Sequence, residues 1–273
     1  MISGGDRVTG TSKYPVETVY VPPGTFQMGY DKCYHYSDSH KSDQCPPHTV
    51  TLTHGTHWMT TEFTNGHMEE LKKRQPGKFD HYKKWCDLEP AGWWNWIKRK
   101  LGFETRTYMC ERPLTGVSWS QANSICSELG MRLPTEAEFE YAAKGKSGKD
   151  EFATATGEMN SGKHFRDLCR HGVSGGDVKE YPPNSYGLYG LCGNVFKWVS
   201  DWYGTYSSDA VTDPQGPMSG TYKVLRGAEG MQDFDGPLHS AYRIFVLPDL
   251  PAPYYHFNYH YRNVGFRCVA TQK

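Results

Sequence analysis

The sequence is informative first for what it lacks. No apolar run approaches the roughly 20 residues of a membrane-spanning helix. The 30 basic and 30 acidic side chains balance, so charge indicates neither nucleic acid nor an anionic membrane surface as the main partner. No cysteine pair has the CxxC spacing of a zinc ribbon or a thioredoxin-like site. The N-terminal stretch MISGGDRVTG has neither the basic nor the apolar region of a signal peptide.

What is present favours a globular fold with many loops. The 273 residues are enough to bury a sizeable core. Hydrophobic residues make up only 37%, yet aromatic residues reach 14%, alongside 29 glycines and 17 prolines. This mixture disfavours both a helix bundle and a disordered chain. We therefore expect an α+β domain whose core depends on Trp, Tyr and Phe.

The eight cysteines do not decide between an oxidising and a reducing compartment. Cys33 and Cys45 flank a short polar stretch and are the most plausible disulfide pair. Buried free thiols are an equal alternative.

Local patterns predict short elements separated by turns. Strands are expected on both sides of a Pro-Pro-Gly turn in 17–29 and again in 48–53, 221–226 and 264–270. A helical pattern runs from Thr64 to about Leu101, with breaks at 75–77 and Pro90. We expect its Trp residues to belong to the core or to a packed surface helix. Two further helices are expected in 113–143, the second with a capping box that starts at Thr135. A long surface loop is expected over 144–180, before a strand that ends near 203.

Six motifs together resemble the formylglycine-generating-enzyme (sulfatase-modifying factor) domain family. They are VPPGTFQMG (21–29), PLTGVSW (113–119), MRLPTEAEFEYAA (131–143), NSYGLYGLCGNVFKWVSDWY (184–203), VLRG (224–227) and GFRC (265–268). The resemblance implies a C-type-lectin-like fold of the formylglycine-generating-enzyme type, loop-rich, with a small mixed sheet and two helices. It implies one domain over 17–273, after an N-terminal extension over 1–16.

The copper oxidases of this family carry two cysteines shortly after the arginine-glycine motif, because Cu(I) prefers thiolate ligands. The corresponding stretch here, 226–243, has no cysteine. The aligned positions fall near Gln232 and Pro237, and the thioether of Met231 is more typical of packing. We therefore expect no oxidase chemistry, assign no catalytic residue and expect no cofactor.

Other metal sites of the family are also disfavoured. Gly190 and Lys197 stand where members often have oxygen ligands for calcium, so we expect no calcium there and a structural role for the Lys197 ammonium. Sulfoxide synthases need an added helical iron-binding domain, for which the chain has no spare residues. His256 and His260 are spaced as zinc ligands on a helix would be, but the preceding Pro-Ala-Pro favours extended chain.

The composition of the C-terminal segment is unusual. Lys, Glu, Met, Gln and Trp make up 57 of the 273 residues, yet none occurs in the 39 residues from Asp233 to Thr271. Average composition would place about eight there, and chance gives their absence on the order of once in ten thousand.

The resemblance suggests a cause. Some family members are variable proteins of diversity-generating retroelements, which substitute adenines, mainly in AAC and AAT codons. Such changes reach fifteen amino acids and leave out Lys, Glu, Met, Gln and Trp. In those proteins the diversified segment lies near the C-terminus, as 233–263 does here. Asn258 and Asn263 are then unmutated or fixed positions, and 240–243 is scaffold.

The candidate ligand-binding residues are dominated by aromatic and imidazole side chains, which suit a rigid contact surface. They are Asp233, Phe234, Asp235, His239, Ile244, Phe245, Leu247, Tyr254, Tyr255, His256, Phe257, Tyr259, His260 and Tyr261. Two alternatives stay open: 244–247 is equally well a buried strand, and 254–261 a packed aromatic loop.

The sequence thus predicts a non-catalytic ligand-binding protein. The partner is expected to be a protein or a cell-surface ligand. The alternatives are a formylglycine-generating-type copper oxidase or pseudoenzyme, and an accessory domain of a surface assembly. The resemblance favours the cell surface or the extracellular space, with the signal or anchor outside this sequence, and leaves the cytoplasm open.

Overall fold

Ten short strands form three small sheets in the computed structural model, which describes residues 16–31, 42–84, 86, 108–158, 176–227, 239–249 and 263–272. The first sheet has the order β1-β4-β10, the second β2-β3-β6 and the third β8-β7-β5-β9. Two contacts are parallel, β3 with β6 and β5 with β9, and the rest are antiparallel. The strands are Thr18–Val21 (β1), Gly24–Met28 (β2), His48–Leu52 (β3), Thr56–Met59 (β4), Phe196–Trp202 (β5), Val211–Thr212 (β6), Lys223–Arg226 (β7), Arg243–Val246 (β8), Val264–Gly265 (β9) and Val269–Thr271 (β10).

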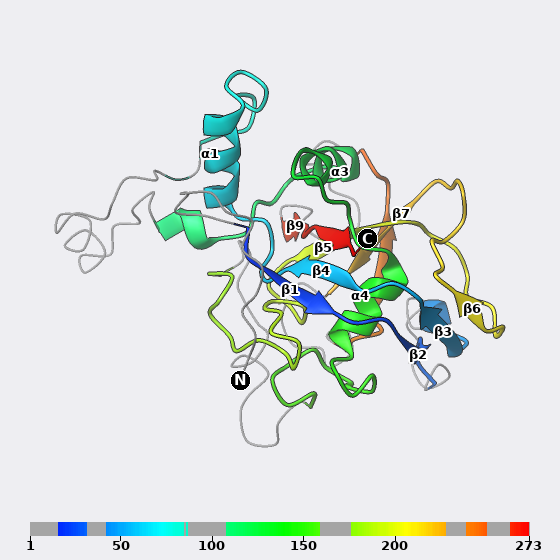
Figure 1. Cartoon of the computed structure of the whole chain (residues 1–273). Helices are drawn as coiled ribbons and strands as arrows, with labels where there is room; N and C mark the ends of the chain where they lie inside the picture. The colour runs from blue at the N-terminus through cyan, green and yellow to red at the C-terminus, as the bar shows by residue number, and fades with distance from the viewer. Residues whose placement is uncertain are drawn as a thin grey trace.

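Three α-helices accompany the sheets: α1 (Asn65–Arg74), α3 (Trp119–Glu128) and α4 (Glu136–Ala143). Each begins with a capping box, at Thr64, Ser118 and Thr135, which satisfies amides that the first helical turn leaves free. Short 3-10 turns lie at Ser42–Gln44 (η1) and Tyr108–Glu111 (η2). Figure 1 shows α3 and α4 beside the strands and α1 at the periphery. The mixed α+β architecture is confirmed, and the described residues alone contain one helix and two sheets more than the resemblance implied.

The core is rich in aromatic side chains, as the composition predicted. Trp58, Phe63, Phe139 and Phe266 are fully buried, and the Phe63 and Phe266 rings stack at 5.0 Å. Burial of each such ring contributes a few kcal/mol. Among the described residues, no helix is long and apolar enough to cross a membrane.

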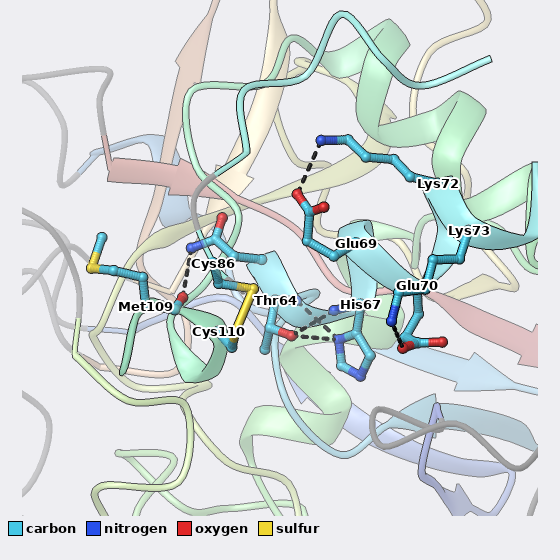
Figure 2. The surroundings of a disulfide bond; sticks show 10 residues. Thr64, His67, Glu69, Glu70, Lys72, Lys73, Cys86, Met109 and Cys110 are labelled. Carbon is cyan, nitrogen blue, oxygen red and sulfur yellow. Dashed lines mark hydrogen bonds and ion pairs between the residues drawn. A yellow bond between two sulfur atoms is a disulfide. The ribbon is translucent and has the colours of Figure 1, made fainter. Parts of the chain in front are cut away.

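Disulfides close the fold in several places. One joins Cys126 of α3 to Cys268 before β10, and another joins Cys86 to Cys110 of η2. Figure 2 shows the second bond next to the start of α1, where the Asn65 side chain donates a hydrogen bond to the Met109 carbonyl at 2.9 Å.

The cysteines of the described residues are all disulfide-bonded, Cys45 and Cys192 included. The expected partner of Cys45, Cys33, lies outside the described residues, as do the tryptophans of 93–96.

Candidate ligand-binding surface

Strand β8 carries the part of the predicted binding segment that the structure describes best. It lies at the end of its sheet in the order β8-β7-β5-β9. Ile244 packs against the core, and the neighbouring Val246 is buried. Phe245 is half-buried, and Leu247, just beyond the strand, is 39% exposed. The segment 244–247 is therefore neither wholly buried nor wholly exposed, because alternate side chains of a strand point to opposite faces.

Phe245 lies between two tyrosines from the neighbouring strand ends. Its ring centroid is 4.1 Å from that of Tyr203 and 5.2 Å from that of Tyr222. Tyr203 donates its backbone N–H to the Tyr222 carbonyl at 2.8 Å, which holds the two together. Tyr222 is 40% exposed. We call Tyr203, Tyr222, Phe245 and Leu247 the aromatic patch.

Tyr203 and Tyr222 are not among the residues predicted from the sequence, which all lie after Gln232. A weak signal was available: Tyr203 directly follows β5, and Tyr222 directly precedes β7. Both therefore stand at ends of strands that neighbour each other in the sheet that contains β8. Rigid aromatic side chains on fixed strand ends are typical anchors in protein interfaces.

A buried cation, the Arg243 guanidinium, lies against the Tyr203 ring of the aromatic patch. The Arg243 guanidinium lies 4.8 Å from the Tyr203 ring centroid and 4.2 Å from that of Tyr206, a cation–π arrangement. Burial and a hydrogen bond with Asp43 raise the pKa of Tyr203 to about 12.

His239 lies near a different part of the surface. Its ring stacks on Tyr30 at a centroid distance of 4.6 Å and meets the edge of Tyr242 at 6.2 Å. The Tyr30 hydroxyl donates to the Glu151 carboxylate at 3.0 Å. Burial and this bond raise the pKa of Tyr30 to about 12. His239 is thus a half-buried, packed ring, with part of its surface open.

The remaining candidates lie outside the described residues. They are Asp233, Phe234, Asp235, Tyr254, Tyr255, His256, Phe257, Tyr259, His260 and Tyr261. The residues on either side of them are described. Ser240, Ala241, Tyr242 and Arg243 are buried, in keeping with the scaffold role expected of them, and Asn263 is 1% exposed.

Lys197 makes the contacts that a metal cation would make. Its ammonium is fully buried, donates to the carbonyl oxygens of Gly190 and Gly193, the latter at 2.6 Å, and lies 3.3 Å from the Glu62 carboxylate. Carbonyl and carboxylate oxygens are the ligands that calcium prefers. Burial lowers the pKa of Lys197 to about 8, against the opposing effect of Glu62. These contacts give Lys197 the structural role expected of it.

In the part of the chain that the structure describes, no group of three or more His, Cys, Asp or Glu side chains is placed to hold a metal ion. The sequence has no cysteine between Cys192 and Cys268, so the thiolate pair that a copper oxidase needs after Arg226 is missing.

Comparisons with known proteins place the chain in a family. Residues 7–272 match the model of the sulfatase-modifying factor enzyme 1-like domain. Formylglycine-generating enzyme of Mus musculus is 28% identical over 92% of this chain and 74% of its own length. An inactive C-alpha-formylglycine-generating enzyme 2 of Bos taurus is 30% identical over 74% of this chain and 64% of its own.

A solved structure shares the fold. Treponema denticola variable protein 1 superposes with a TM-score of 0.68 at 21% identity, covering 98% of this chain and 99% of that one. The match of nearly the whole chain to the family model, with the same fold, shows that this chain belongs to the sulfatase-modifying factor enzyme 1-like domain family.

Proposed function

We propose that this chain is a non-catalytic binding protein whose ligand-contacting surface is diversified by a retroelement. The observation that carries the proposal is the absence of Lys, Glu, Met, Gln and Trp from 233–271. Adenine-directed substitution of Asn codons cannot produce these five residue types. No packing requirement excludes them jointly, because they include large apolar, charged and amide side chains.

The aromatic patch supports the proposal. Phe245 and Leu247 belong to the segment, are partly exposed, and adjoin the framework residues Tyr203 and Tyr222. A ligand that covers the patch would contact both variable and framework side chains. Aromatic anchors of this kind are frequent at the centres of protein–protein interfaces, so we favour a protein or another cell-surface ligand.

The disulfides support a location outside the reducing cytoplasm. The described cysteines are all bonded, and such bonds persist in oxidising compartments. Display on a cell surface or release from the cell suits a binding protein of this kind. Its fold neighbour in Treponema denticola is likewise named a variable protein.

Deep sequencing of the gene and its flanks from a culture tests the proposal. We expect variation to concentrate in codons 233–263, at positions that read AAC or AAT in a nearby near-repeat. A uniform segment, with no near-repeat and no reverse transcriptase gene beside it, would overturn the proposal.

The alternative is a formylglycine-generating enzyme or pseudoenzyme, which the identity to the Mus musculus enzyme favours. The missing thiolate pair argues against oxidase chemistry. Incubating the purified chain with Cu(I), oxygen and a cysteine-containing sulfatase peptide separates the two. Conversion of the cysteine to formylglycine, seen by mass spectrometry, would establish the enzyme.

A further inference from the structure

Two buried arginines stand at the two ends of the connection between β7 and β8. Arg226 is the last residue of β7 and Arg243 the first of β8, and the two are direct partners in the antiparallel register. Their exposed fractions are 0% and 1%. Like charges opposite each other on neighbouring strands are destabilising, so this pair needs compensating groups.

Two glutamates of α4 supply the compensation. Glu140 lies 2.6 Å from Arg226, and Glu136 lies 3.3 Å from Arg226 and 2.7 Å from Arg243. The two carboxylates are four residues apart and so share one face of the helix. Burial alone would raise the pKa of Glu140, but Lys144 and Arg226 bring it below its ordinary value. The site therefore holds charged, matched partners.

Both arginines also donate to backbone carbonyls. Arg226 donates to the carbonyl oxygens of Ser240 at 2.9 Å and Ala241 at 3.0 Å. Arg243 donates to those of Asp43 and Gly204, both at 3.0 Å. Every residue has a backbone carbonyl, whatever its side chain. These hydrogen bonds therefore hold the main chain and do not depend on which side chains it carries.

The exit from β7 is fixed as well. Gly227 has a φ of +63°, in the left-handed region that favours glycine. A Cβ there would lie 2.6 Å from the Leu191 carbonyl oxygen. The main chain is therefore set at residue 227 on one side of the connection and at 240–243 on the other.

We propose that Arg226, Arg243, Glu136 and Glu140 form a backbone clamp that fixes residues 226–227 and 240–243, on the two sides of the connection 228–238, whatever the sequence of that connection. The clamp residues are positioning residues: the connection between them is then free to change without loss of the fold. The clamp itself does not depend on the proposed function. Only the idea that the connection contacts a ligand rests on the proposed function.

A coupling experiment tests the clamp. Residues 229–237 are replaced by a Gly/Ser sequence of equal length in three backgrounds: the natural chain, Arg226→Lys and Arg267→Lys. Lysine keeps the charge but loses the planar fork that reaches two carbonyls and a carboxylate together. Arg267 is the matched control, because it is equally buried and also donates to carbonyls, those of Met59 and Thr60 at 3.3 and 3.4 Å.

We expect the replacement to shift the Tm of the natural chain by less than about 2 °C. In Arg226→Lys it lowers the Tm by a further amount of about 5 °C or more, because the ends of the connection are no longer held. In Arg267→Lys the Tm starts lower, but the replacement adds nothing. Hydrogen exchange at the amides of 239–242 accelerates at least tenfold in Arg226→Lys and not in Arg267→Lys, on the logic of local opening.

Two results would contradict the proposal. A large Tm loss on replacement in the natural chain would overturn the clamp, because the connection would then support the fold. Equal effects of the replacement in all backgrounds would overturn it too. If Arg226→Lys does not fold, Glu140→Gln, which keeps the side-chain shape, takes its place with the same expectations. If deep sequencing finds no codon variation, the proposed function fails. The stability data would still decide about the clamp, because they do not depend on that variation.

Discussion

At the scale of single residues, the buried Lys197 ammonium joins two turn carbonyls to the Glu62 carboxylate. The sequence showed an ammonium where relatives often have a carboxylate. It did not show that Glu62, 135 residues earlier in the chain, lies 3.3 Å from that ammonium. Such a partner follows from tertiary packing, which no local pattern encodes.

Lys197→Met is expected to destabilise the chain strongly. It leaves two buried carbonyls without their donor and takes one of two cations from the buried Glu62 carboxylate, which keeps Arg267 at 3.8 Å. We expect a loss of about 3–5 kcal/mol. Lys179→Met is the control, because Lys179 pairs with Glu17 at the surface and such pairs contribute about 0–1 kcal/mol. Denaturant unfolding measures both. Similar losses would contradict the structural role of Lys197, as would a calcium-dependent rise in the Tm of the unmodified chain.

Phe245→Ala is expected to cost little stability, because its ring is half-buried and lies outside the core. We expect a loss of less than about 1.5 kcal/mol, against about 3–5 kcal/mol for Phe266→Ala, the same change at a fully buried ring. Thermal unfolding of the two variants makes the comparison. If Phe245→Ala costs as much as Phe266→Ala, then Phe245 is a core residue and not a replaceable contact.

At the scale of elements, local signals predicted the helices better than the strands. Capping residues at Ser118 and Thr135 mark the starts of α3 and α4 in the sequence itself. Strand β6 has two residues, and its parallel pairing with β3 joins segments 161 positions apart. Strand β4, with four residues, lies between β1 and β10, from opposite ends of the chain. Neither strand is long enough to show a period, so both were missed.

The link between α3 and the chain before β10 is a further element-scale feature. We expect removal of the Cys126–Cys268 bond, by substituting both with Ala, to cost about 2–5 kcal/mol. It joins residues 142 positions apart, whereas Cys86–Cys110 joins residues 24 apart. Because longer closed loops lose more entropy in the unfolded chain, the first removal lowers the Tm more than the second. The reverse order in thermal scans would contradict this account.

At the scale of the whole molecule, the family was predictable from the sequence, and the contacts of the aromatic patch were not. Six motifs in family order predict the fold, and among the elements they cover are helix α4, strand β5 and most of strand β7. The patch joins Tyr203, Tyr222 and Phe245 through the pairing of β5, β7 and β8. That pairing places framework side chains next to the candidate segment, which composition alone does not reveal.

The free energy of unfolding of the whole chain is expected to depend on pH through Asp201. Burial, and then Glu136, raise the pKa of Asp201 to about 7, although its carboxylate accepts bonds from the Glu136 N–H at 2.8 Å and the Ser200 hydroxyl at 2.9 Å. The unfolded chain releases this proton near pH 3.8. Between those values the folded chain holds the extra proton. The contribution of Asp201 to stability is therefore full below about pH 4 and is lost as pH rises through 7.

Asp201→Asn removes this titration while keeping an acceptor oxygen. We expect the variant to gain stability relative to the natural chain as pH rises from 4 to 8, by up to about 3–4 kcal/mol. Urea unfolding of the natural chain and the variant at several pH values measures the difference. A constant difference for Asp201→Asn would mean that this carboxyl titrates alike in the folded and unfolded chains, and that the carboxylate finds compensation around β5.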